Sequence, residues 1–281
     1  MIFFYFLSIV CNQIIFQYFL FIKILNFLKQ NGYDQIFDRT NMGKVSQAIK
    51  RFFTFVPTTE LPIWLDEKEE IANTITHLIG AVLCVPALIM LMISAVRIGD
   101  KSLIIGNLVF GLSMNILYWN SSFYHGVNPK KHPKLKIITR YLDHISIYLL
   151  IAGSYTPLTL VSMKGTTGYV ILGVVWGIAL VGTVIKILHF DGFYSVALFL
   201  YIGMGWIVIF SIKDLIKAFS KRGLYWLVIG GIFYTIGCYF FSKDTIVPFF
   251  HAVWHLYVLM GSVCHFIVVY FYCYSDKYIN N

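Results

Sequence analysis

The sequence predicts an all-α membrane protein, a bundle of seven transmembrane helices with room for an extra N-terminal hydrophobic helix. Two features of its composition lead to this fold class: 58% of the 281 residues are hydrophobic and only 12% are charged. Soluble domains carry about 25% charged residues. A chain so poor in charge cannot cover a water-facing surface, which excludes a cytosolic globular protein, a disordered chain and a disulfide-stapled secreted domain.

The third observation is a series of seven apolar segments after residue 73, joined by short polar connections. Each segment has a length near the roughly 20 residues that a helix needs to cross about 30 Å of hydrocarbon. A β-barrel would instead show alternating segments of about ten residues. The seven-helix domain therefore covers residues 74–273, followed by a short tail at 274–281. We place the helices at 74–96, 103–124, 137–161, 168–187, 194–212, 224–241 and 249–273.

Residues 1–41 form a hydrophobic N-terminal extension whose role the sequence leaves open. Residues 1–28 are dense in Phe, Ile and Leu but lack a basic start and a small-residue cleavage motif, so we expect no cleaved signal peptide. The stretch is an extra span, an interfacial helix, or untranslated sequence before a start at Met42. Residues 42–73 are polar and basic with several phenylalanines, which favours an interfacial arm.

The net charge of +9 points to the membrane rather than to nucleic acid, because the basic residues lie mainly between apolar runs. In such positions Lys and Arg set orientation and contact anionic lipid. We therefore expect no nucleic-acid partner, and membrane lipid as environment or substrate; the sequence indicates no protein partner. The excess of basic residues favours a multi-pass protein of the cell membrane with residues 29–73 in the cytoplasm.

Polar residues gather at four places, the end of the second apolar segment and the starts of the first, third and seventh. Because each span reverses the direction of the chain, all four places face the same leaflet, which is cytoplasmic on the orientation above. Ionisable residues at membrane depth are costly and are candidates for function. These residues are Glu70, Asn73 and His77 in the first segment, Ser121 and His125 in the second, Asp143 in the third, and His251 and His255 in the seventh.

The histidine spacing predicts a site for one zinc ion. His251 and His255 are four residues apart, so their side chains project from one helix face about 5–6 Å apart. That is the spacing of the H-E-x-x-H zinc motif, although Ala252 stands where its glutamate would be. With His125 as third ligand, a fourth position stays open for water, as in catalytic zinc sites. Asp143 is the acid best placed to orient that water or to take its proton.

Other interpretations stay open for the neighbouring residues. Ser121 lies one turn before the histidine of the second segment and is either a donor to the site or a hydroxyl bonded to its own helix. Glu70, Asn73 and His77 share one helix face; they brace the first helix beneath the site or mark its water-facing end, and we expect bracing. For His265, deeper in the seventh segment, we expect packing or a hydrogen bond between helices rather than ligation.

Over residues 66–273, the motifs resemble the hemolysin III family, a branch of the progestin and adiponectin receptor superfamily. They are E-x-x-N-x-x-x-H, S-x-x-x-H, D-H with a later A-G-S-Y-T-P, and H-x-x-x-H with a later H-F, in this order. The resemblance implies a seven-helix fold with one zinc ion near the cytoplasmic leaflet. It also implies His125, His251 and His255 as ligands, Asp143 in contact with the metal-bound water, and Ser121 nearby.

The same resemblance leaves three functions in competition, and whether the protein is an enzyme stays open. Related receptors and alkaline ceramidases look like intramembrane lipid-amide hydrolases, which implies a zinc-dependent hydrolase of a lipid amide or ester with Asp143 as base. The hemolysin III name implies a pore and cytolysis. The third function is a receptor or regulator with structural zinc. We expect the hydrolase, because the polar residues gather at one end and no full span carries the polar stripe of a channel.

Overall fold

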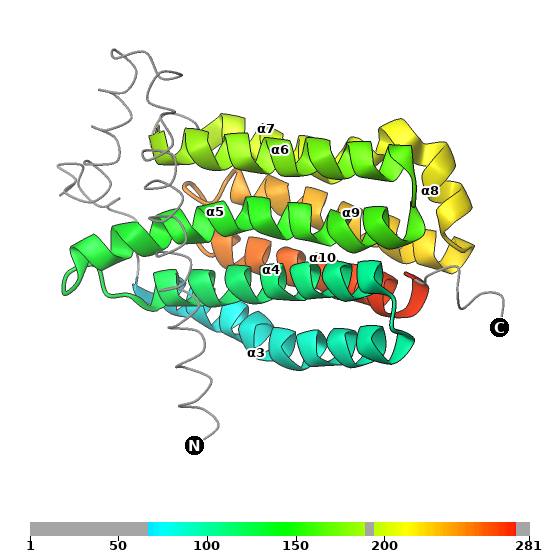
Figure 1. Cartoon of the computed structure of the whole chain (residues 1–281). Helices are drawn as coiled ribbons and strands as arrows, with labels where there is room; N and C mark the ends of the chain where they lie inside the picture. Colours follow the sequence, from blue (N-terminus) through cyan, green and yellow to red (C-terminus); the bar gives the residue numbers. More distant parts are fainter. Residues whose placement is uncertain (1–66, 189–193, 274–281) are drawn as a thin grey trace, which may run out of the picture. The chain divides into compact units, whose positions relative to one another are not determined.

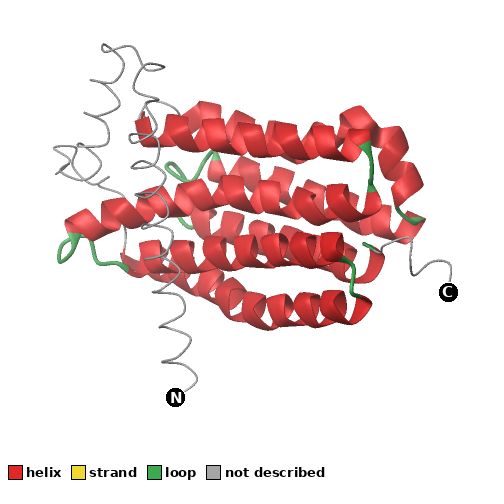
Figure 2. Cartoon of the chain, in the orientation of Figure 1, coloured by secondary structure: helices red, strands yellow, loops and turns green. Residues whose placement is uncertain are grey.

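The computed structural model describes residues 67–188 and 194–273, which lie within one compact unit. In these two ranges the chain is helical and contains no strand (Figure 2), and seven helices are long and apolar enough to cross a membrane. The predicted fold class is therefore confirmed. The predictions for residues 1–41, for residues 42–66 of the basic arm and for the tail at 274–281 fall outside the described residues.

Ten helical elements follow one another along the described chain (Figure 1). Two of them are irregular, a π-helical turn, η2, and a 3-10 turn, η3. The elements are α3 (Glu67–Ile98), α4 (Lys101–Gly126), α5 (Pro133–Pro157), η2 (Leu158–Ser162), α6 (Thr166–Leu188), α7 (Tyr194–Trp206), η3 (Ile207–Ser211), α8 (Ile212–Ala218), α9 (Lys221–Phe241) and α10 (Phe250–Tyr272).

The first span starts earlier than predicted, since α3 begins at Glu67 rather than at residue 74. Its first turn contains three acidic residues, Glu67, Glu69 and Glu70, which stabilise the positive end of a helix dipole. The end of the predicted arm is therefore helical. Glu70 and Asn73 belong to a transmembrane helix and can point toward its neighbours.

Short turns with specific end signals join the helices. The Asp100 side chain accepts a hydrogen bond from the Leu103 backbone N–H at 3.0 Å and so caps α4. Ser220 caps α9 in the same way. Gly99 (φ 73°) and Gly165 (φ 116°) adopt left-handed conformations that glycine reaches without a steric penalty. These tight reversals keep consecutive helices antiparallel.

Pro157 is the last residue of α5 and lies within the third span. Proline has no backbone N–H to donate and clashes with the preceding turn, so the regular helix ends there. The span continues through η2 to Ser162, where the wider π-helical turn accommodates the interruption. The fifth span is likewise interrupted, by η3 between α7 and α8.

The helices form a closed arrangement in which the last span meets the first. α3 packs against α4 and α10, α4 packs against α5, α5 packs against α6, and α9 packs against α10. As Figure 1 shows, the starts of α3, α5 and α10 and the end of α4 lie at the same end of the bundle. This agrees with the sequence-based expectation that the four polar places share one membrane depth.

Apolar side chains cover the outside of the bundle, while polar groups bind its helices together inside. Leu180 and Phe210 are 66% and 91% exposed, which suits contact with lipid rather than water. Inside, the Asn107 side-chain amide donates to the Leu91 carbonyl at 3.0 Å and links α4 to α3. Such interhelical hydrogen bonds stabilise membrane bundles, in which apolar burial gives little preference for one helix partner over another.

Candidate metal centre

Three histidines from two helices converge at the end of the bundle where α4 ends and α10 begins. The candidate ligand nitrogens of His125, His251 and His255 all lie within 4.8 Å of one another. The ring centroid of His125 is 5.0 Å from that of His251 and 5.1 Å from that of His255; the first pair of rings is tilted and the second is edge-on, so neither is stacked. The predicted cluster therefore forms from residues more than a hundred positions apart in sequence.

The ring nitrogens of these histidines divide into two kinds. Each Nδ1 atom faces a polar partner, described below, whereas all three Nε2 atoms are buried without a hydrogen-bond partner. A buried polar atom without a partner costs about 1–3 kcal/mol. Imidazoles whose second nitrogen is held in this way are typical of metal ligands. The three free Nε2 lone pairs therefore fit a metal ion, and zinc accepts this donor set with a fourth position open.

His125 is held by an ion pair that connects α3, α4 and α5. Glu70 Oε1 lies 3.1 Å from His125 Nδ1, and the other Glu70 oxygen pairs with Lys136 Nζ. Lys136 is only 1% exposed; it also donates to the Tyr124 carbonyl at 2.8 Å and lies over the Tyr124 ring. Glu70 thus contacts a candidate ligand, as bracing would require. Sequence reasoning missed Lys136, which looked like one more basic residue near a loop.

His251 is held by Asp244, an acid that sequence reasoning also missed. Asp244 Oδ2 lies 2.7 Å from His251 Nδ1. Asp244 is in the turn between α9 and α10, and its position shortly before the H-x-x-x-H pair at the same end of the bundle was the available signal. The turn ends at Phe249, a non-glycine residue at φ 62°, whose backbone N–H donates to Glu69 Oε1 at 3.0 Å. The turn that carries Asp244 is therefore attached to α3.

His255 is held by α3 alone. Its Nδ1 atom lies 3.0 Å from Thr76 Oγ1 and 3.2 Å from the Asn73 carbonyl oxygen. Asn73 therefore contacts His255 through its backbone carbonyl. Its side-chain oxygen, Oδ1, is buried without a hydrogen-bond partner. His77 stacks on the His255 ring with centroids 3.4 Å apart and an interplanar angle of 16°. His77 thus packs against a candidate ligand, and Thr76 is a contact that sequence reasoning missed.

Asp143 and Ser121 are both buried at this end of the bundle, with exposed fractions of 3% and 0%. The Asp143 carboxylate interacts electrostatically with His251 and with the Ser121 hydroxyl. Ser121 Oγ nevertheless forms no hydrogen bond of regular geometry, so of the two alternatives left open for Ser121 the bond to its own helix is not made. A buried carboxylate near three convergent imidazoles can accept a proton or position a polar reactant.

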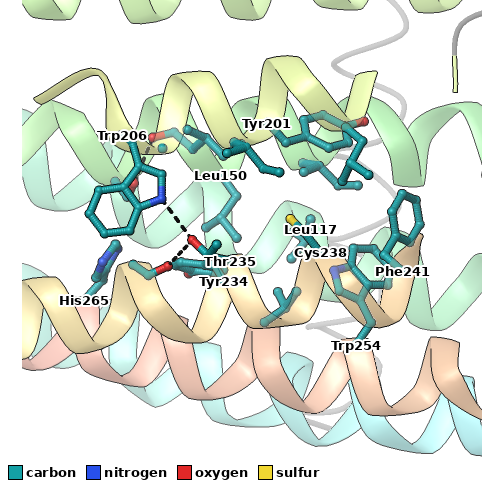
Figure 3. Close-up of a pocket in the computed structure, with 18 of the residues that line it drawn as sticks. Leu117, Leu150, Tyr201, Trp206, Tyr234, Thr235, Cys238, Phe241, Trp254 and His265 are labelled. Carbon is teal, nitrogen blue, oxygen red and sulfur yellow. Dashed lines mark hydrogen bonds between the residues drawn. The ribbon is translucent and has the colours of Figure 1, made fainter. Parts of the chain in front are cut away.

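A cavity of about 90 Å³ extends from this end into the bundle. It touches His77 and Asp143 and runs between α5, α7, α9 and α10 (Figure 3). The space is several times the roughly 10–15 Å³ that one water molecule needs. Its wall is largely apolar, which suits a hydrocarbon chain better than water. The apolar wall includes Leu117, Leu150, Phe241, Trp254 and Val258.

Known proteins match this chain over nearly the same residues that the structure describes. A family model described as "Haemolysin-III related" matches residues 65–266. The chain belongs to the hemolysin III family. "Hemolysin-3" of Bacillus cereus is 43% identical over 205 residues, which is 73% of this chain and 92% of the relative. The "Hemolysin-3 homolog" of Bacillus subtilis (strain 168) is 43% identical over 213 residues, 76% of this chain and 98% of the relative.

A more distant hemolysin III relative is human. The Homo sapiens protein "Monocyte to macrophage differentiation factor" is 30% identical over 212 residues, 74% of this chain and 86% of the relative. The region matched by the hemolysin III model contains all eight polar residues singled out from the sequence. Membership in this family of membrane proteins agrees with the seven spans and with the resemblance noted from the motifs.

Proposed function

We propose that the protein is a zinc-dependent intramembrane hydrolase of a lipid amide or ester. The observation that carries this proposal is the convergence of three buried Nε2 atoms without partners. They lie at the same end of the bundle as Asp143, which lines a largely apolar cavity. A lipid carbonyl group beside Asp143 would have its hydrocarbon chain in that cavity.

His125, His251 and His255 would hold one zinc ion through Nε2. Glu70, Asp244, and Thr76 with the Asn73 carbonyl keep the opposite ring nitrogens engaged, which fixes the orientation of each imidazole. Zinc bound in this way supplies Lewis-acid polarisation of a carbonyl oxygen and makes water more acidic. The identity of the metal is part of the proposal.

Asp143 acts as the general base and then as the general acid. Its carboxylate takes a proton from the water that adds to the lipid carbonyl carbon, and a new C–O bond forms. The C–N or C–O bond of the substrate then breaks, and Asp143 returns the proton to the departing amine or alkoxide. Proton transfer of this kind contributes about 10²–10⁴-fold to a rate. Ser121 would keep the Asp143 carboxylate in place through their interaction.

We also propose that the metal site faces the cytoplasm. The turn after α4, at the same end as the histidines, carries the exposed residues Lys130 and Lys131, and exposed Lys134 follows in the first turn of α5. Lys and Arg near span ends favour the cytoplasmic side. The basic residues within 29–73 support the same orientation. Labelling of a single cysteine introduced at Lys131 in intact cells tests this assignment.

A hydrolysis assay tests the activity. Purified full-length protein is incubated in detergent with a panel of lipid amides and esters, and released fatty acid is measured by mass spectrometry. The proposal predicts turnover of at least one class by the wild type and none by the His251→Ala variant. Absence of turnover across both classes, with the metal fully bound, would contradict the hydrolase.

The name hemolysin, carried by the bacterial relatives, favours a second candidate, a pore that lyses cells. Dye release from vesicles that contain the protein separates the two functions. A pore predicts release that survives the His251→Ala substitution, whereas the hydrolase predicts no release that is independent of the metal ligands. A regulator with structural zinc predicts loss of thermal stability on chelation and no reaction to lose.

A further inference from the structure

The end of the bundle opposite the histidine cluster carries a group of basic side chains that the proposed function does not use. α9 runs from Lys221 to Phe241, and the Phe241 ring lies beside the His251 ring, with centroids 6.0 Å apart. The start of α9 and the short helix α8 before it therefore lie at the other end of the bundle (Figure 1). The exposed basic residues there are Lys213 and Lys217 of α8 and Lys221 and Arg222 of α9.

Acidic partners for these four cations are scarce. Within the ranges that the structure describes, none of the four forms an ion pair. Asp214 is the one acidic residue in α8 and the first turn of α9, which leaves this segment with a net charge of +3. Asp100, at the same end of the bundle, is already paired with Lys164 at 3.7 Å. The described part of the chain therefore does not neutralise the group.

The exposed side of α8 is divided into an apolar half and a basic half. Successive residues of a helix are about 100° apart, so Ile212 and Ile216 share one face and Lys213 and Lys217 share the adjacent face. All four side chains are exposed, whereas Leu215 is buried against the bundle. This pattern is typical of a helix at a membrane surface, where apolar side chains contact acyl chains and lysines reach the headgroups.

The start of α9 adds to the positive potential beside α8. Only Phe219 and Ser220 separate the two helices, so Lys221 and Arg222 follow closely on the basic face of α8. Phe219 is buried, which attaches this turn to the bundle. The N-terminus of a helix also carries about half a positive charge. The two basic side chains and the helix terminus therefore favour an anion at the same place.

The orientation of the protein does not explain these charges. With the metal site toward the cytoplasm, as proposed above, α8 belongs to the opposite leaflet. Lys and Arg are ordinarily less frequent beside spans on that side of a membrane. The basic group therefore acts against the orientation that the rest of the chain favours, and an anionic ligand gives it a role.

We propose that α8 and the start of α9 bind an anionic phospholipid such as phosphatidylglycerol. The lipid phosphate lies among Lys213, Lys217 and Lys221, and the acyl chains contact Ile212 and Ile216. A phospholipid fits this surface better than a soluble phosphate compound, because a soluble anion would leave the apolar half of α8 without contact. The site is separate from the histidine cluster, so the proposal depends neither on zinc nor on hydrolysis.

Lipid binding by the purified full-length protein in detergent tests the proposal. Native mass spectrometry measures the dissociation constants of phosphatidylglycerol and of phosphatidylcholine with the same acyl chains. The wild type is expected to bind phosphatidylglycerol about tenfold more tightly, because its net negative charge lies beside several lysines. This preference is expected to fall as the ammonium acetate concentration is raised, since salt screens exposed charges. Glycerol 3-phosphate, which has the phosphate but no acyl chain, is expected to compete poorly.

Two triple variants remove the same charge from opposite ends of the bundle. The first carries Lys213→Gln, Lys217→Gln and Lys221→Gln. The matched control carries Lys130→Gln, Lys131→Gln and Lys134→Gln, at the histidine end. The first variant is expected to bind the two lipids equally, whereas the control is expected to keep the preference because the acidic first turn of α3 lies at its end of the bundle. All six lysines are exposed, so neither variant loses a buried contact.

Equal wild-type affinities for the two lipids, a preference that survives in the first variant, or an equal loss in both variants would overturn the proposal. Glycerol 3-phosphate that binds as tightly as the lipid would also overturn it, in favour of a soluble phosphate. If the first variant does not fold, the wild-type preference and its salt dependence decide. His251→Ala is expected to keep the preference, so failure of the metal site and failure of the lipid site are distinguishable.

Discussion

The carboxylate of Asp244 lies 2.7 Å from Nδ1 of His251, so a side chain in the turn between α9 and α10 orients a histidine in the following helix. Each of the three clustered histidines has such a partner at Nδ1. Glu70 of α3 holds His125, and Thr76 of the same helix holds His255. Because α3 supplies two of the three partners, the geometry of the cluster depends on a helix that contributes no candidate ligand.

Asp244→Asn is expected to weaken zinc binding by about 10–100-fold, because partners of metal-ligating histidines have effects of this size. The amide cannot accept from Nδ1 as strongly as the carboxylate, and the His251 ring loses its fixed orientation. Competition with a chromogenic zinc chelator in detergent measures the affinity. Asp214→Asn in α8, outside the cluster, serves as the control and should leave the affinity unchanged. Equal affinities for wild type and Asp244→Asn would remove Asp244 from the site.

Lys136→Met is expected to lower the free energy of unfolding by about 3 kcal/mol, since it leaves the mostly buried Glu70 carboxylate without its cation. The double variant Glu70→Gln/Lys136→Met should recover most of that loss. Its zinc affinity should still be reduced, because His125 has lost its carboxylate. Chemical unfolding and chelator competition on the same samples check both parts. Full recovery of zinc affinity in the double variant would contradict the role of Glu70.

Phe249→Gly is expected to be more stable than Phe249→Ala by about 1 kcal/mol. Position 249 has φ 62°, and an L-residue with a Cβ atom pays about 1–2 kcal/mol in this left-handed region. Both variants remove the same half-exposed aromatic ring, so their difference isolates the backbone. Thermal unfolding in one detergent measures it. If Phe249→Ala proved equal or more stable, the turn would not be strained at this residue.

Asp143→Asn is expected to reduce turnover of the best lipid substrate by about 10²–10⁴-fold while zinc remains bound. Asparagine keeps the shape of the side chain, but its neutral amide cannot take up a proton as the carboxylate does. Turnover number and zinc content are measured on the same preparation. Retained turnover would assign proton transfer to another group, and loss of zinc would show that Asp143 acts on the metal site instead.

The number and placement of the spans could be predicted from the sequence because hydrocarbon thickness alone fixes the length of an apolar helix. The shared depth of the polar residues followed from the alternating direction of the spans. The ends of the elements were less predictable. α3 includes the acidic turn Glu67–Glu70, which precedes the apolar run and which the hydropathy pattern does not reveal as part of the helix.

The histidine triad could be anticipated because two of its members lie on one helix face, and that spacing survives in any fold. The groups around the triad could not be anticipated in the same way. Lys136 looked like a solvated charge, and only the packing of α5 against α3 shows that it pairs with Glu70. The contact between the Asn73 carbonyl oxygen and His255 also could not be predicted, because every residue has a backbone carbonyl and the sequence does not show which one is used.

Metal analysis of the purified protein tests the central claim most directly. Wild type and His251→Ala are purified side by side in metal-free buffer after expression with zinc, and bound metal per chain is measured by mass spectrometry. A three-histidine site predicts about one zinc ion per wild-type chain and near zero in the variant, with both proteins folded. Substoichiometric metal in the wild type, or the same content in His251→Ala, would contradict it.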